Sequence, residues 1–100
     1  MIFAVPHHTG RDEAAAEHPG ADYFDLEEYI EHKIGMSIPD IVADSPWRYR
    51  VIEEEALRDL VVMSEITGSD RIVRLGPDTL SNPECVRLIS SLYQPHDAPR

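Results

Sequence analysis

The protein has 100 residues, 42% of them hydrophobic and 28% charged, a composition typical of one small soluble domain. Nineteen acidic residues outnumber nine basic ones, and the formal net charge of −10 disfavours direct binding of DNA or RNA, because no basic patch can displace phosphate counterions. No apolar run approaches the ~18 residues of a membrane span, and the N-terminus lacks the basic region of a signal peptide.

The N-terminal part of the chain contains one apolar run followed by a weakly apolar stretch. Residues 2–5 form a short apolar segment that Pro6 limits, and they are compatible with a strand or a tethered arm. Residues 6–21 contain two glycines, two prolines and few large apolar groups. Such a stretch buries little surface, so we expect a long loop or flexible segment there, with at most a turn or two of helix over residues 12–17.

Two helical segments follow, each with its own start signal. Asp25 is a good N-cap with Glu28 three residues later, and Gly35 provides a stop, which predicts a helix over residues 26–34. Ser37 repeats the pattern on a smaller scale and predicts a short helical turn over residues 38–43.

The longest predicted helix covers residues 46–67 and organises the rest of the chain. Ser45 is suited to the N-cap, Pro46 to the first helical position, and Gly68 to a left-handed C-terminal position. Apolar residues recur at helical spacing, and the last turns are apolar almost all round, which indicates neighbours on more than one side. The residues of the main face are Tyr49, Ile52, Ala56, Leu60 and Met63.

The C-terminal third is predicted to hold one ambiguous apolar segment and one further helix. Residues 71–75 allow either a short strand pairing with residues 2–5 or a helical turn. Asn82 and Pro83 begin a helix over residues 83–93 that points Cys85 into the core, and residues 95–100 are expected to fray. The sequence therefore predicts a single, mainly α domain over residues 1–100, with at most a minor two-stranded ribbon of 2–5 with 71–75.

No pattern for catalysis, metal binding or a cofactor emerges from the sequence. The histidines lack the spacing of a zinc site, the serines lack a nucleophile-elbow context, and no Gly-rich phosphate loop is present. Cys85 alone forms no intrachain disulfide, which favours the cytoplasm, and as a buried thiol it is expected to be inert. We therefore predict no enzyme, no metal and no cofactor.

Acidic and aromatic side chains are interleaved in the N-terminal half. Residues 1–44 carry a formal charge of −8 and residues 45–100 only −2. Carboxylates and aromatic faces both bind arginine-rich surfaces, so we predict a protein partner with a basic surface. The candidate partner-binding residues are Asp22, Tyr23, Asp25, Glu27, Glu28, Glu31 and Trp47. Trp47 has a second interpretation, as an apolar anchor of the central helix.

The leading hypothesis is a small inhibitor or immunity-type protein, encoded by a phage or mobile element, that mimics nucleic acid and blocks a basic nucleic-acid-binding surface. The alternative is an accessory subunit that grips a larger enzyme or assembly through apolar surface. A metal-binding or enzymatic domain, requiring convergence of His7, His8, His32 and Cys85, is the third. Homodimerisation through the central helix stays open.

Overall fold

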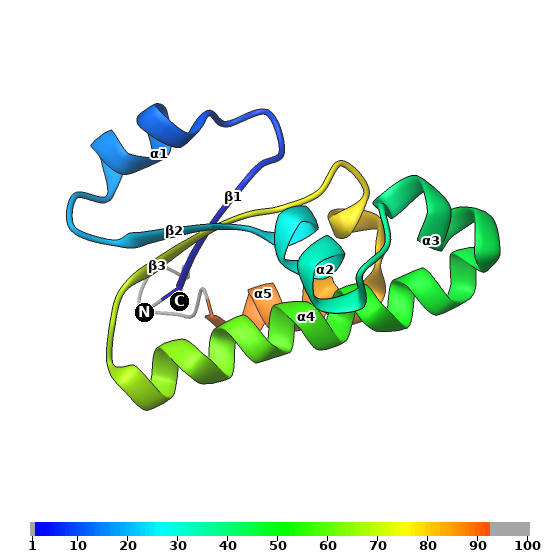
Figure 1. The fold of residues 1–100 in the computed structure, drawn as a ribbon. Helices are drawn as coiled ribbons and strands as arrows, with labels where there is room; N and C mark the ends of the chain where they lie inside the picture. The colour runs from blue at the N-terminus through cyan, green and yellow to red at the C-terminus, as the bar shows by residue number, and fades with distance from the viewer. Residues whose placement is uncertain (1, 93–100) are drawn as a thin grey trace.

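A computed structural model describes residues 2–92 and shows a three-stranded parallel sheet with helices on its two faces (Figure 1). The strands lie in the order β1-β3-β2, so β3 is central and both neighbours run parallel to it. The elements along the chain are β1 (Ile2–Val5), α1 (Arg11–Glu17), β2 (Asp22–Asp25), α2 (Leu26–Ile34), α3 (Ile38–Asp44), α4 (Pro46–Thr67), β3 (Arg71–Arg74), the 3-10 turn η1 (Thr79–Ser81) and α5 (Pro83–Leu92).

The prediction of a mainly α domain with a two-stranded ribbon is therefore wrong. Residues 2–5 do pair with 71–74, but residues 22–25 form a third strand on the other side of β3. Strands β1 and β2 both run parallel to β3, so a crossover must connect them, and residues 6–21 supply it. This segment, expected to be a loop, contains α1.

Side chains on the two faces of the sheet enter two different apolar clusters. On one face Ile2, Val73 and Phe24 pack against α2, α4 and α5 in the main core. On the other face Val5 and Ile72 pack with Ala14 of α1. Strand residues alternate in this way because successive side chains point to opposite faces of a sheet.

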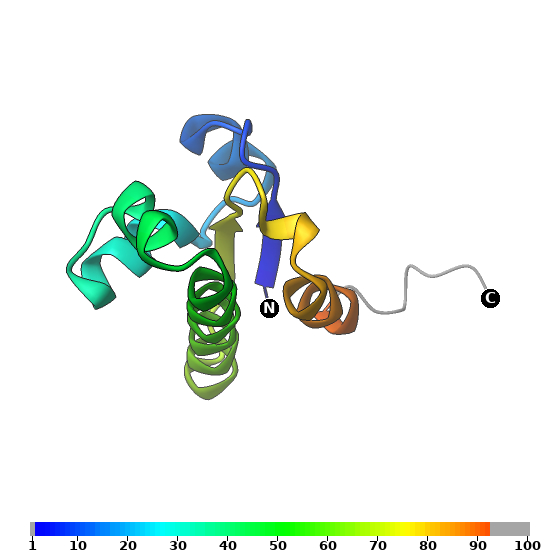
Figure 2. The same ribbon diagram turned by 90° about the vertical axis from the view of Figure 1, so that its right-hand side faces the viewer.

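Helix α4 is the long support beneath the sheet. Viewed from its end it lies between α5 on one side and α2 with α3 on the other (Figure 2). Its side chains of Ala56, Leu57 and Leu60 are at most 1% exposed, whereas Met63 and Ile66 at its C-terminal end are exposed. The predicted apolar face is thus buried over its first four turns and open at its end.

The predicted caps of α2 and α4 are present. The Asp25 carboxylate accepts from the backbone N–H groups of Glu27 and Glu28, and Ser45 Oγ accepts from Arg48 N. Gly35 and Gly68 end the two helices in the left-handed conformation, with φ of 80° and 71°. These local signals explain why both helices have the bounds that the sequence predicts.

Some sequence predictions concern residues beyond those described. The expected fraying of residues 95–100 and the end of the last helix at residue 93 lie outside residues 2–92. Within the described part of the chain, no helix combines the length and apolar character needed to cross a membrane.

We predict that Leu60→Ala lowers the free energy of unfolding by ~2–5 kcal/mol, because it leaves a cavity beneath the sheet. Urea denaturation followed by far-UV circular dichroism measures the change. Ile66→Ala on the same helix is the matched control, since the Ile66 side chain is 79% exposed and its loss is expected to change stability by less than ~0.5 kcal/mol. Equal losses in the two variants would contradict this assignment of the core.

Candidate functional site

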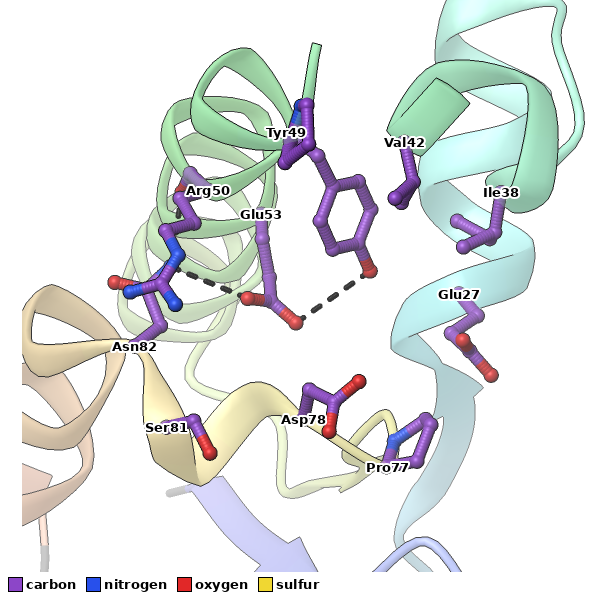
Figure 3. A pocket seen from close by; sticks show the side chains of 11 residues that line it. Glu27, Ile38, Val42, Tyr49, Arg50, Glu53, Pro77, Asp78, Ser81 and Asn82 are labelled. Atoms are coloured by element: carbon purple, nitrogen blue, oxygen red, sulfur yellow. Dashed lines mark hydrogen bonds between the residues drawn. The ribbon is translucent and has the colours of Figure 1, made fainter. Parts of the chain in front are cut away.

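A pocket of about 340 Å³ lies where α2, α3, the start of α4 and the turn after β3 meet (Figure 3). Its size falls in the range of small-molecule sites, and its wall combines apolar side chains with a few charged groups. The lining residues are Glu27, Ile38, Val42, Pro46, Tyr49, Arg50, Glu53, Pro77, Asp78, Ser81 and Asn82. Four separate segments supply them, so the pocket exists only in the folded chain.

The buried carboxylate of Glu53 holds the floor of the pocket together. Its side chain is 2% exposed and accepts hydrogen bonds from Thr79 Oγ1 at 2.8 Å and Asn82 Nδ2 at 3.1 Å. The Tyr49 hydroxyl donates to the same carboxylate at 3.5 Å (Figure 3). Burial, together with the adjacent Glu53 charge, raises the pKa of Tyr49. Glu53 thereby joins α4 to the turn after β3.

Gly76 allows a close approach between that turn and α2. A Cβ built on Gly76 would lie 3.2 Å from Thr79 Oγ1 and 3.3 Å from Glu27 Cγ, which is tighter than ordinary packing. The backbone N–H of Gly76 donates to Thr79 Oγ1 at 2.8 Å, so the turn is also fixed by a hydrogen bond. A side chain at this position would require Thr79 or Glu27 to shift by a few tenths of an ångström.

Besides Glu53, three charged side chains reach the pocket from different directions. Arg50 comes from α4, Glu27 from α2 and Asp78 from the turn after β3 (Figure 3). Burial is the main cause of the raised pKa of Glu27, and the nearby Asp25 charge raises it further. Among the described residues, no carboxylate forms an ion pair with the Arg50 guanidinium. The pocket therefore offers one unpaired cation beside two carboxylates.

A second polar arrangement joins the carboxyl ends of all three strands. Arg74, the last residue of β3, donates through Nε to Asp25 Oδ2 at 2.8 Å and also forms an ion pair with it through Nη2. Its Nη1 donates to the carbonyl oxygen of His7, just after β1, at 2.9 Å. We call this group of Arg74, Asp25 and the His7 carbonyl the strand-end clamp.

The structure places the seven predicted partner-binding residues in two regions. Six of them, from Asp22 to Glu31, lie on β2 and α2, whereas Trp47 lies at the start of α4. Trp47 is 74% exposed, so its alternative role as a core anchor is wrong. Asp25 belongs to the strand-end clamp, and Glu31 Oε2 accepts from the backbone N–H of Ile38 at 2.7 Å. Contact of these residues with a basic partner stays a prediction.

Most of the chain matches a known protein family. The family model described as shikimate kinase matches residues 11–93. The chain belongs to the shikimate kinase family. The match includes the residues that line the pocket, because Glu27 is the first and Asn82 the last of them.

Individual members of the family show the same relationship. Over 64 residues the chain is 41% identical to a shikimate kinase of Thermus thermophilus, a match covering 62% of this chain and 32% of that protein. Over 71 residues it is 38% identical to shikimate kinase of Chlorobium limicola, covering 70% of this chain and 33% of that protein. The chain thus spans about a third of the length of these relatives.

A solved structure shows the fold. The crystal structure of shikimate kinase from Aquifex aeolicus superposes with a TM-score of 0.64 at 23% sequence identity, over 90% of this chain and 54% of that one. The fold is accordingly the α/β fold of shikimate kinase, with a parallel sheet and helices on its faces.

Family membership corrects the functional predictions made from the sequence. The prediction of an acidic, phage-type inhibitor protein is wrong, and so is the prediction that the protein is not an enzyme, because the family and the individual relatives are kinases. The histidine hypothesis gains no support: within residues 2–92 no three His, Cys, Asp or Glu side chains gather as metal ligands.

Sequence reasoning missed the pocket residues Arg50, Glu53 and Asp78. Helical spacing favours ion pairs of Glu54 with Arg50 and with Arg58, and of these two the structure shows the pair with Arg58. The acidic run around Glu53 suggests a solvated carboxylate, whereas this side chain is buried. One signal was present, since Glu53 falls four residues after Tyr49 and one residue after Ile52, inside the apolar stripe of α4.

We predict that Arg74→Met lowers the free energy of unfolding by about 2–3 kcal/mol, somewhat less than the ~3–5 kcal/mol typical of one partner lost from a fully buried pair. The reason for the smaller value is that the Arg74 side chain is 28% exposed, whereas that of Asp25 is 6% exposed. Urea denaturation measures the loss. Arg87→Met is the control, because Arg87 pairs with Glu84 at an exposed site on α5. Indistinguishable losses would show that the clamp does not stabilise the sheet.

We predict that Cys85 resists alkylation and aromatic disulfide reagents in the folded protein. Burial, with a smaller contribution from Glu53, raises the pKa of the Cys85 thiol to about 12, so almost no thiolate forms at pH 8. The unfolded chain, with an ordinary thiol pKa, should react rapidly in denaturant under the same conditions. Because the thiol loses its proton more easily in the unfolded chain, the free energy of unfolding falls as pH rises above the unfolded-state pKa of Cys85. Rapid labelling of the native protein at pH 8 would contradict the buried position.

Proposed function

We propose that the pocket between α2, α3, α4 and the turn after β3 binds the phosphoryl acceptor of the family, shikimate or a closely similar hydroxylated ring carboxylate. The relatives are named for that substrate. The supporting observation is the combination, in one pocket of about 340 Å³, of an unpaired arginine with two carboxylates and an apolar wall. Since the chain spans about a third of these relatives, the proposal concerns binding of the acceptor and does not assign the complete kinase reaction to this chain.

Arg50 would bind the carboxylate of the acceptor. A guanidinium presents paired N–H donors whose geometry matches a carboxylate, and such charge-assisted bonds are among the strongest in proteins. The Arg50 backbone is held in place, because its carbonyl oxygen accepts from Asn82 Nδ2 at 2.9 Å. The Arg50 backbone is thus fixed, while its guanidinium forms no ion pair with a carboxylate among the described residues.

Glu27 and Asp78 would bind the hydroxyl groups of the same ligand. Carboxylates accept hydrogen bonds from hydroxyls, and they repel a second carboxylate, so they orient the ligand with its acid group towards Arg50. The raised pKa of Glu27 reflects its partial withdrawal from water, which strengthens a hydrogen bond formed there.

Apolar side chains line the pocket across from Arg50 (Figure 3). Ile38 and Val42 of α3 and the ring of Tyr49 are suited to pack against the carbon ring of the ligand. A small ligand with polar groups on its edge and an apolar ring face therefore matches the lining. We also propose a cytoplasmic location, supported by the single cysteine in the sequence.

We predict that Arg50→Met weakens shikimate binding roughly 10- to 100-fold, the effect of losing charge-assisted bonds worth about 1.5–3 kcal/mol. Isothermal titration calorimetry of the folded variant measures it. Arg48→Met is the matched control: Arg48 lies two residues away on α4, pairs with Asp44 at an exposed site and does not line the pocket. Binding of shikimate by Arg50→Met with unchanged affinity, or no binding by the unaltered protein, would refute the proposal.

A further inference from the structure

A kinase family implies a nucleoside triphosphate as phosphoryl donor, and the place to look for its site is the turn between β1 and α1. In open parallel sheets ligands bind beyond the carboxyl ends of the strands. The phosphate loop has the form Gly-x-x-x-x-Gly-Lys-Ser/Thr between a strand and a helix, with successive backbone N–H groups and the lysine around the phosphates. The turn of this chain, residues 6–10, occupies that position.

Two of the five backbone positions of this turn offer no donor to a phosphate. Pro6 has no N–H group, and the N–H of Thr9 is used internally, donating to the Pro6 carbonyl oxygen at 3.0 Å. Gly10, the only glycine of the turn, has an extended φ of −74°. The helix that follows is one of 7 residues, too short to add a substantial dipole.

The lysine that a phosphate loop requires is also missing from the turn. Lys33 is the only lysine among the 100 residues, and Arg11 stands at the start of α1. Lys33 lies on α2 and forms an ion pair with Asp59 of α4, and this interaction raises its pKa. Arg11 lies over the ring of Tyr23, 5.0 Å from its centroid.

The strand-end clamp lies at the carboxyl ends of the strands, beside the β1–α1 turn. A carboxylate at this edge of the sheet, such as that of Asp25 at the end of β2, is the kind of group that could bind the magnesium ion of a nucleotide. Asp25 Oδ1 accepts from the N–H groups of Glu27 and Glu28, and its Oδ2 binds the Arg74 guanidinium. Both oxygens are therefore engaged, and the adjoining cation opposes a divalent metal. The His7 carbonyl of the turn is bound by the same guanidinium.

We infer that in this chain the strand-end clamp stands in place of the nucleotide site, so that the β1–α1 turn binds no nucleoside triphosphate. The net charge of −8 over residues 1–44 adds repulsion of a triphosphate. A phosphoryl donor would therefore have to be held at a place other than this turn. A second part of the inference rests on the proposed function: binding of the acceptor in the pocket does not depend on nucleotide.

The test is a titration of the full chain with fluorescent N-methylanthraniloyl-ATP and magnesium, alongside ¹⁵N–¹H spectra recorded with unlabelled ATP and magnesium. Shikimate kinase of Thermus thermophilus provides the positive control for the probe. We expect no saturable signal at concentrations that saturate the control, and no shift of the amide signals of His7, Thr9 and Arg11. Saturable binding that unlabelled ATP displaces, with shifts of these amides, would overturn the inference.

A second titration separates this inference from the proposed function. Shikimate affinity is measured by calorimetry with and without magnesium and a non-hydrolysable ATP analogue, and we expect the two dissociation constants to agree. A several-fold tightening by the nucleotide would overturn the second part of the inference. Absence of shikimate binding in both titrations would refute the proposed function and with it the second part, while the nucleotide titration would still decide the first.

Discussion

The ion pair between Arg74 and Asp25 is the interaction on which the sheet most depends. Parallel strands of four residues form few ladder hydrogen bonds, and a guanidinium at the end of the central strand adds directed bonds to both neighbours at once. Asp25 also caps α2, so the same carboxylate fixes the direction in which that helix leaves the sheet. One residue pair thus sets the position of β2, of α2 and, through α2, of Glu27 at the pocket.

On the other side of the pocket, the buried carboxylate of Glu53 fixes α4 to the turn after β3. A buried carboxylate without a cation is costly unless several donors bind it, and here hydroxyl and amide donors from Tyr49, Thr79 and Asn82 do so. These donors belong to α4 and to the turn after β3, which are far apart in the sequence. The pocket is consequently shaped by two fixed carboxylates, Asp25 and Glu53, that are not themselves free to bind a ligand.

The sequence predicts the helices of this fold much better than its sheet. Residues 26–34 and 46–67 carry caps, stops and a helical period, all local signals, and the structure shows α2 and α4 with these bounds. Strand β2 has only the aromatic pair Tyr23 and Phe24 between two aspartates, and it is stabilised by pairing with β3, 49 residues further on. Pairing of that kind leaves no periodic trace in four residues. The pocket could not be predicted for a similar reason, because its lining comes from four segments.

The acidic N-terminal half shows why net charge was a poor guide to function. Several of its carboxylates have structural partners: Asp25 binds Arg74 and the start of α2, and Glu31 accepts from the backbone of Ile38 at the start of α3. Glu27, by contrast, lines the pocket, where the proposed function gives it the role of binding a hydroxyl group of the ligand. A cluster of acids in the sequence therefore divides, once folded, into helix caps, an ion pair and a pocket wall. Charge asymmetry along a chain indicates a partner only when it remains after the carboxylates used in caps, ion pairs and pocket walls are left out of the count.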